Sequence, residues 1–152
     1  MIASTLLRST LALALLAGAA LPALAADETP VGLWKNIDDT TGKPKAMIRI
    51  SESNGVLEGK IEKLFRPADQ EQNPVCAKCE GALKDQPLIG LPILAGLKKS
   101  GDEYSGGTII DPENGKVYKS KLSVSDGGKK LNVRGYIGMP ILGRSQTWVR
   151  EQ

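Results

Sequence analysis

The sequence contains no histidine, and this absence excludes more chemistry than any single residue that is present. Without an imidazole there is no ordinary general base, no Ser-His or Cys-His nucleophile pair and no His-ligated metal site. The acidic residues are scattered over expected turns and outer strand positions, with no sign of two carboxyl groups facing each other across a cleft. We therefore expect no catalytic residues, no cofactor and no enzyme activity.

Cysteines, aromatic residues and long apolar runs are also scarce. The two cysteines cannot supply the four ligands of a structural zinc site, so we expect no metal. Beyond residue 26 no apolar run is long enough to cross a bilayer, and no transmembrane segment is expected in the mature protein. The formal net charge is +3 with both signs interleaved, so there is no basic stripe that would bind nucleic acid.

Residues 1–26 have the pattern of a signal peptide. Arg8 precedes a short apolar run, and the tripeptide Ala-Leu-Ala that ends at Ala25 follows it. The run is too short and wrongly flanked for a spanning helix. We expect a Sec-type signal with cleavage near Ala25 or Ala26, a periplasmic or secreted location, and one mature domain over residues 27–152.

Most of the mature sequence alternates apolar and polar residues between turn formers, which is the pattern of antiparallel strands. Ala46, Ile48 and Ile50 share one face of an expected strand, and the Asn54-Gly55 pair after it is typical of a tight hairpin. Because one face of each strand is polar, the other must be buried, against a second sheet or by closure of the sheet on itself. The further strands are expected over residues 57–61, 103–110, 116–124, 130–136 and 144–150.

Two stretches, IDDTTGK at 37–43 and IDPENGK at 110–116, match at Ile, Asp, Gly and Lys with equal spacing. We interpret them as one hairpin chemistry used twice, in which Asp accepts backbone hydrogen bonds and Gly takes a positive φ. The alternative is a cation site built from Asp38, Asp39 and Asp111. It lacks the alternating ligands and the closing Glu of a calcium loop.

Residues 66–87 show no strand or helix period and contain three prolines and both cysteines. A structureless connection of this length is unusual in a compact domain and indicates a functional or stapled loop. Cys76 and Cys79 form a CxxC, and in an exported protein a disulfide that shapes the loop is the default. Thiol–disulfide exchange is the alternative, with Lys78 between the two cysteines.

Two tryptophans mark the ends of the expected sheet. Trp34 lies at the start of the first strand and Trp148 in the last, with Arg150 two residues further on the same face. If the first and last strands pair, the sheet closes into a barrel and has no free edges. The two indole rings would then close the base of the barrel, with Arg150 stacked nearby.

An apolar hexamer occurs twice, as IGLPIL over residues 89–94 and as IGMPIL over 137–142. In each copy a Pro that lacks an amide donor follows a Gly by two positions, so we expect both segments to bend at a rim, close together at one end of the barrel. Their side chains could line a cavity, contact a partner or lie in the core. The lining selected as a candidate ligand-binding site is Leu91, Ile93, Leu94, Met139, Ile141 and Leu142.

The series GLW, CAKCEG, IGLPILAGLKK, GDEYSGGTIIDPENGKVYKSKL, VRGYIG and ILGRSQTWVR resembles the DUF2147 family of exported bacterial proteins over residues 31–151. Its first element, Gly32-Leu33-Trp34, is similar to the GxW signature of the lipocalin and calycin superfamily. The resemblance implies an all-β fold, a small antiparallel up-and-down lipocalin-like barrel of about eight strands with a long CxxC-bearing loop. It implies no reaction. Because the sequence has few aromatic residues, a small or collapsed cavity is an alternative to an open one.

These observations give three hypotheses for function. The leading one is an exported binding protein of lipocalin type whose ligand is small and hydrophobic. The second is a cell-envelope interaction module with a filled barrel, whose exposed apolar segments dock a protein partner. The third is a redox protein that acts through Cys76 and Cys79.

Overall fold

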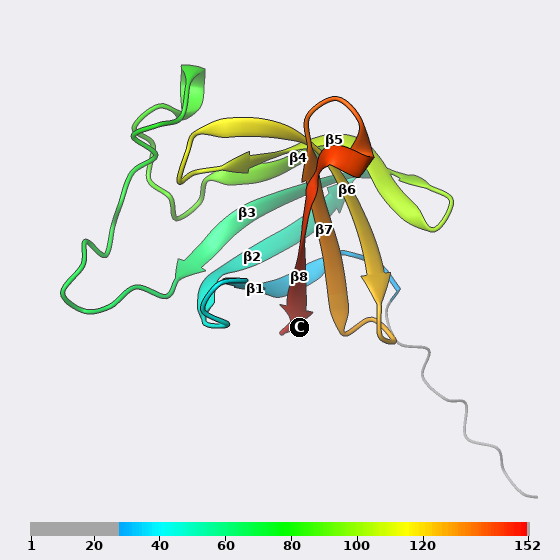
Figure 1. Ribbon diagram of the computed structural model, residues 1–152, viewed down its shortest axis with the longest axis horizontal. Helices are drawn as coiled ribbons and strands as arrows, with labels where there is room; N and C mark the ends of the chain where they lie inside the picture. Colours follow the sequence, from blue (N-terminus) through cyan, green and yellow to red (C-terminus); the bar gives the residue numbers. More distant parts are fainter. Residues whose placement is uncertain (1–27, 152) are drawn as a thin grey trace, which may run out of the picture.

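Eight antiparallel strands close into a barrel in the computed structural model, which describes residues 28–151 (Figure 1). The predicted signal peptide, residues 1–26, lies outside the described residues. Two short 3₁₀ helices, η1 (Gly81–Leu83) and η2 (Pro140–Leu142), lie in the connections after β3 and β7. Within the described part of the chain no helix is long and apolar enough to span a bilayer. The strands are β1 (Gly32–Ile37), β2 (Pro44–Ser53), β3 (Val56–Leu64), β4 (Pro92–Ser100), β5 (Glu103–Asp111), β6 (Lys116–Ser125), β7 (Lys130–Tyr136) and β8 (Arg144–Arg150).

The alternation in the sequence becomes the inner and outer faces of the strands. On β2, Ala46, Ile48 and Ile50 are buried, whereas the residues between them are partly exposed. The β2–β3 hairpin turns at Asn54 and Gly55, whose φ angles of 51° and 77° are both positive, as a tight two-residue turn requires. The predicted strands and this turn are therefore confirmed. Only β4 was not predicted, because its Gly, Pro and apolar residues do not alternate.

Each strand pairs with its neighbour in sequence, and β1 and β8 complete the ring. Across this last seam Trp34 faces Arg150 and Lys35 faces Val149. The up-and-down barrel expected from the sequence is therefore confirmed. Closure gives each of the eight strands two neighbours, although β1 and β8 pair at only two positions.

The chain reverses direction at every connection, so successive connections fall at alternate ends of the barrel. The β1–β2, β3–β4, β5–β6 and β7–β8 connections lie together at one end, which we call the open end. The other three connections and the segment before β1 lie at the opposite, closed end. The long β3–β4 connection, green in Figure 1, extends out beside the barrel.

Trp34 and Arg150 seal the closed end. Trp34 is fully buried, and its Nε1 donates a hydrogen bond of 2.7 Å to the carbonyl oxygen of Pro30. The guanidinium carbon of Arg150 lies 4.2 Å from the centroid of the Trp34 ring. The same guanidinium donates hydrogen bonds to carbonyl oxygens of the β6–β7 turn and of the segment before β1, those of Gly128, Thr29 and Val31. The predicted stacking of Arg150 is confirmed.

Trp148 lies at a different level of the barrel. It precedes Arg150 by two residues on the inner face of β8, so its ring is nearer the open end, by about 3.3 Å for each residue along the strand. It is buried and faces a cavity. The expectation that both indole rings close the base therefore holds for Trp34 and not for Trp148.

Candidate functional site

A cavity of about 940 Å³ extends from the barrel interior to the open end, where the turns around the mouth and part of the long β3–β4 connection also line it. Its volume falls in the upper part of the range of ~300–1,000 Å³ that is typical of small-molecule sites. Ala46 on β2 is a small residue on its wall, whereas the space over Gly135 on β7 is occupied by Ile109, whose Cγ2 would lie 3.3 Å from an added Cβ. The barrel is therefore open inside, not collapsed. The apolar part of the wall includes Ala46, Ile48, Ile61, Ile93, Ile109, Val133 and Trp148.

The structure separates the six side chains selected from the two hexamers. Ile93 and Leu142 line the cavity. Leu91 and Leu94 are buried in the core outside this lining, and Leu94 fills the space over Gly59, where an added Cβ would lie 2.9 Å from the leucine Cβ. Met139 and Ile141 are exposed and also lie outside the lining. Contact of any of the six with a ligand stays a prediction.

The two hexamers share their backbone geometry. Gly90 and Gly138 have φ angles of 90° and 76°, in the left-handed region that favours glycine. Pro92, two residues after Gly90, begins β4, and Pro140, two residues after Gly138, begins η2. Both segments lie at the open end, and both contribute to the wall of one cavity. The predicted bends and their shared end of the barrel are confirmed.

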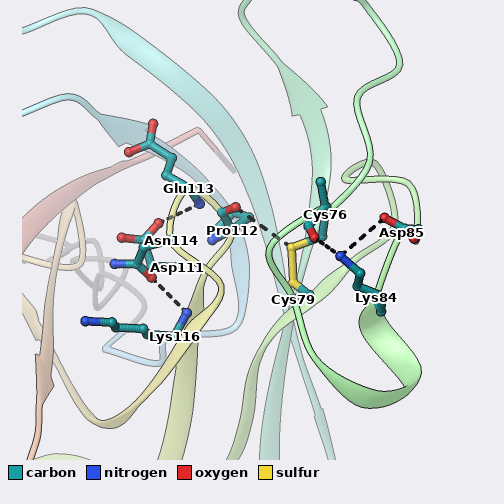
Figure 2. Close-up of a disulfide and its surroundings, with 10 residues drawn as sticks. Cys76, Cys79, Lys84, Asp85, Asp111, Pro112, Glu113, Asn114 and Lys116 are labelled. Carbon is teal, nitrogen blue, oxygen red and sulfur yellow. Dashed lines mark hydrogen bonds and ion pairs between the residues drawn. A yellow bond between two sulfur atoms is a disulfide. The ribbon is translucent and has the colours of Figure 1, made fainter.

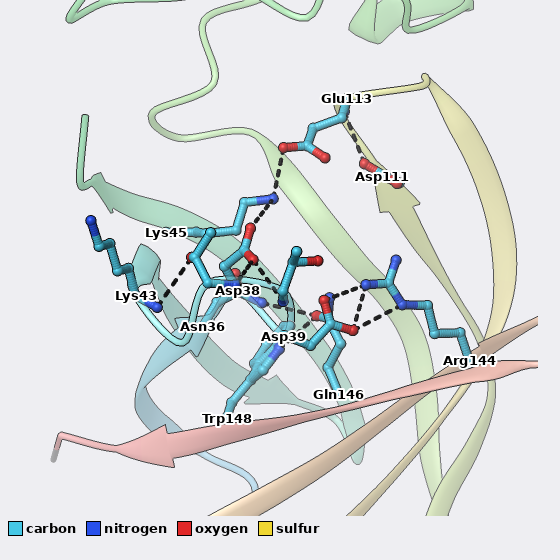
Figure 3. Close-up of polar contacts among 12 residues, drawn as sticks. Asn36, Asp38, Asp39, Lys43, Lys45, Asp111, Glu113, Arg144, Gln146 and Trp148 are labelled. Atoms are coloured by element: carbon cyan, nitrogen blue, oxygen red, sulfur yellow. Dashed lines mark hydrogen bonds and ion pairs between the residues drawn. The ribbon is translucent and has the colours of Figure 1, made fainter. Parts of the chain in front are cut away.

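Ion pairs tie three connections together around the mouth of the cavity (Figure 3). Lys45 Nζ lies 2.7 Å from Glu113 of the β5–β6 turn and 3.8 Å from Asp38 of the β1–β2 turn. Arg144 at the start of β8 donates from Nε to Asp39 at 3.1 Å. This hydrogen bond lowers the pKa of Asp39, and Asp39 in turn raises the pKa of Arg144. The pairs are exposed, so their main effect is on the geometry of the rim and not on stability.

The two matching turn stretches have matching geometry. Asp38 Oδ1 accepts two backbone N–H groups of its own turn at 2.8 Å, and Asp111 Oδ1 accepts one at 2.9 Å. Gly42 and Gly115, at the equivalent positions, have φ angles of 71° and 72°. The hairpin interpretation is confirmed. In residues 28–151 no three Asp, Glu, His or Cys side chains are placed to hold a metal ion.

The CxxC loop is stapled and fitted against the β5–β6 turn (Figure 2). A disulfide joins Cys76 and Cys79, and both residues are buried. Cys76 Sγ lies 3.8 Å from the carbonyl oxygen of Pro112, and a Cβ added to Gly115 would lie 1.8 Å from the carbonyl oxygen of Lys78. Thiol–disulfide exchange requires an attacking thiolate to reach a sulfur atom. The burial of this disulfide therefore favours the structural staple over the redox hypothesis.

A polar pair inside the cavity was missed by the sequence analysis. Asn36 Nδ2 donates to Gln146 Oε1 at 3.0 Å, and Trp148 Nε1 donates to the same oxygen at 3.2 Å. Asn36 and Gln146 both line the cavity. The available signal was strand periodicity, since each polar residue is two positions from a tryptophan and shares its inward face.

Arg66 is a second candidate functional residue that the sequence does not indicate, because in sequence it is only the first residue of the long loop. It lies just after β3 and lines the cavity. Its Nε is buried and has no hydrogen-bond partner among residues 28–151. No signal in the sequence distinguishes it from the other surface arginines.

An eight-stranded up-and-down antiparallel barrel with a cavity open at one end and a stacked Trp–Arg pair at the other is a lipocalin-like fold. The chain belongs to the family described as an uncharacterized protein conserved in bacteria (DUF2147), which matches residues 32–150. A solved structure with a similar fold is protein HP1028 from the human pathogen Helicobacter pylori, described as belonging to the lipocalin family. It has a TM-score of 0.66 and 19% sequence identity over 80% of this chain and 82% of that chain. No curated protein matches the chain significantly.

Proposed function

We propose that this protein is an exported binding protein, not an enzyme, and that it holds a small hydrophobic ligand inside its barrel. The cavity of about 940 Å³ is the observation that carries this proposal. Apolar ligand surface that enters such a cavity is removed from water, which contributes roughly 25 cal/mol for each Å². The Asn36–Gln146 pair supplies the few fixed polar groups that orient a ligand in sites of this kind.

Two features support export to the periplasm or beyond. The first is the signal-like pattern of residues 1–26, with its apolar run and small-residue end. The second is the disulfide between Cys76 and Cys79, because disulfides persist in oxidising compartments.

The proposal is tested by filling the cavity with one side chain. Val133 on β7 is buried and lines the cavity, whereas Val117 on the neighbouring strand β6 is 56% exposed and does not line it. We expect Val133→Phe to weaken binding of a neutral fluorescent probe, N-phenyl-1-naphthylamine, and Val117→Phe to leave it unchanged. Thermal unfolding of both variants checks that they fold. No saturable probe binding to the wild type, together with no ligand in native mass spectrometry of protein from its own host, would refute the proposal.

A second candidate function is contact with a protein partner in the cell envelope. The connection between β7 and β8 exposes Ile137, Met139, Ile141 and Leu142 by 65%, 65%, 78% and 76%. Arg134 holds this connection in place by donating to the carbonyl oxygens of Pro140 and Gly143. An ordered loop that exposes several apolar side chains is typical of an interaction surface. The cavity, however, is inconsistent with the filled barrel that this hypothesis predicts.

The second candidate is tested by making the loop polar. Met139→Ser combined with Ile141→Ser changes two exposed side chains that do not line the cavity. We expect the double variant to keep its stability within about 0.5 kcal/mol. If the loop docks a partner, crosslinking to envelope proteins in cells is lost in this variant. The same crosslinks with the double variant as with the wild type would exclude this candidate.

A further inference from the structure

We propose that the ligand is an anionic amphiphile, whose charged head group is bound by Arg66 while its apolar tail lies in the barrel. This inference rests on the proposed function and specifies the chemical class of the ligand.

The first observation is the pairing of the charged residues at the cavity. Three cationic residues line it, Lys45, Arg66 and Arg144. Lys45 pairs with Asp38 and Glu113, and Arg144 pairs with Asp39. Arg66 is different, since no hydrogen bond or ion pair to its side chain is formed within residues 28–151.

The second observation is where the unpaired group lies. Arg66 Nε is buried, and the cavity that Arg66 lines also has apolar side chains such as Ile48, Ile61 and Val133. A guanidinium stays charged at every physiological pH and carries five N–H donors. Leaving such a donor buried and unpaired costs on the order of its desolvation penalty, which an anion bound at this position would remove.

The carboxylates at the mouth do not provide that anion. Asp38, Asp39, Asp111 and Glu113 all line the cavity, and each already accepts a backbone hydrogen bond or pairs with Lys45 or Arg144. They outnumber the three cations there, so net charge alone would favour a cationic ligand. Recognition of an anion therefore depends on the local position of Arg66, and its removal should have a large effect on selectivity.

The guanidinium also limits the chemistry of the head group. Arginine matches planar carboxylates and phosphate oxygens with two parallel hydrogen bonds. The Ile and Val wall beyond it offers no further charge and fits an alkyl tail. A single-tailed amphiphile with a carboxylate or phosphate head satisfies both parts of the site.

The experiment compares ligands that share one tail and differ in the head. Dodecanoate, dodecyl phosphate, dodecanol and dodecyltrimethylammonium are titrated below their micelle concentrations into the full mature protein, with calorimetric detection. We expect both anions to bind the wild type about ten-fold or more tightly than dodecanol, and the cation to bind most weakly. The tighter of the two anions identifies carboxylate or phosphate as the preferred head.

The matched variants are Arg66→Gln and Arg49→Gln. Arg49 is on the outer face of β2, pairs with Glu62 and does not line the cavity. Arg66→Gln should lose the preference for the anions and bind dodecanol as the wild type does, whereas Arg49→Gln should retain the preference.

Two results would overturn the inference and leave the proposed function intact. One is wild-type protein that binds dodecanol or the cation as tightly as the anions. The other is Arg66→Gln protein that keeps the full preference for the anions. If none of the four probes binds, and N-phenyl-1-naphthylamine does not bind either, the proposed function fails together with the inference.

Discussion

The Arg150 guanidinium lies 4.2 Å from the centre of the Trp34 ring, and the two residues are also opposite each other across the seam between β1 and β8. One residue therefore joins the first and last strands, covers the indole and satisfies carbonyl oxygens on either side of the seam. The buried cation–π contact and the charge-assisted hydrogen bonds add to the pairing of the strands.

Arg150→Met keeps much of the side-chain volume and removes these polar contacts. We expect it to lower the free energy of unfolding by about 2–4 kcal/mol, measured by urea denaturation. Arg49→Met is the control, since it breaks only an exposed pair with Glu62 and should cost less than about 1 kcal/mol. Equal losses in the two variants would show that Arg150 does not seal the barrel.

Gly115→Ala and Gly42→Ala are a matched pair. Both glycines have φ near +70° at equivalent turn positions, so both variants carry the same backbone strain of about 1–2 kcal/mol. Only at Gly115 would the new Cβ meet the CxxC loop, since nothing lies within 4 Å of it at Gly42. We expect Gly115→Ala to be the less stable variant and to increase hydrogen exchange in residues 74–88. If the two variants have the same stability and exchange, the loop does not pack against the β5–β6 turn.

Cys76→Ser combined with Cys79→Ser removes the staple. The closed loop is short, so we expect a loss of about 2 kcal/mol in the free energy of unfolding, in a protein that still folds. Wild-type protein under reducing conditions should lose the same amount. Binding of a neutral probe should persist in the variant, because neither cysteine lines the cavity. An in vivo phenotype that requires both thiols and is independent of stability would instead revive the redox hypothesis.

The Asp39–Arg144 pair predicts a dependence of stability on pH. Its hydrogen bond lowers the pKa of Asp39 in the folded state, so its stabilising effect is present above the unfolded-state pKa of about 4. The effect is lost as the pH falls through the lower, folded-state pKa. We expect Asp39→Asn to have a slightly lower Tm than the wild type at pH 7 and the same Tm once the carboxyl is protonated. A difference in Tm that persists at low pH would have another origin. Arg144→Gln should give the same pattern, with no additional loss in the double variant.

The strands and turns could be predicted because their signals are local. Alternation placed Ala46, Ile48 and Ile50 on one face, and the Asn54-Gly55 pair fixed a tight turn. Each of these features depends on steric preferences of a few neighbouring residues, which tertiary packing here reinforces.

The candidate site could be predicted only in part. The shared end of the two hexamers followed from an up-and-down order of strands, but the cavity wall is assembled from residues of many strands. The roles of three residues, Asn36, Gln146 and Arg66, depend on their surroundings in the folded protein. A polar residue on the inner face, or an arginine whose Nε has no partner, can be recognised only once the barrel has closed. Sequence periodicity predicts which face of a strand a residue occupies, but it does not predict the volume of the cavity inside the barrel.

The repeated hexamer shows the difference between local backbone geometry and the burial of side chains. The local backbone follows from the amino acids alone. In both copies a left-handed Gly is followed two residues later by a Pro that starts a new element, because these preferences are steric and the same in both copies. Tertiary structure decided the rest. In the first copy Leu91, Ile93 and Leu94 are buried, where the chain enters β4. In the second copy the corresponding Met139, Ile141 and Leu142 are exposed, because η2 stands outside the sheet between β7 and β8. Burial depends on what lies across from a side chain, and that is set by the closed barrel as a whole.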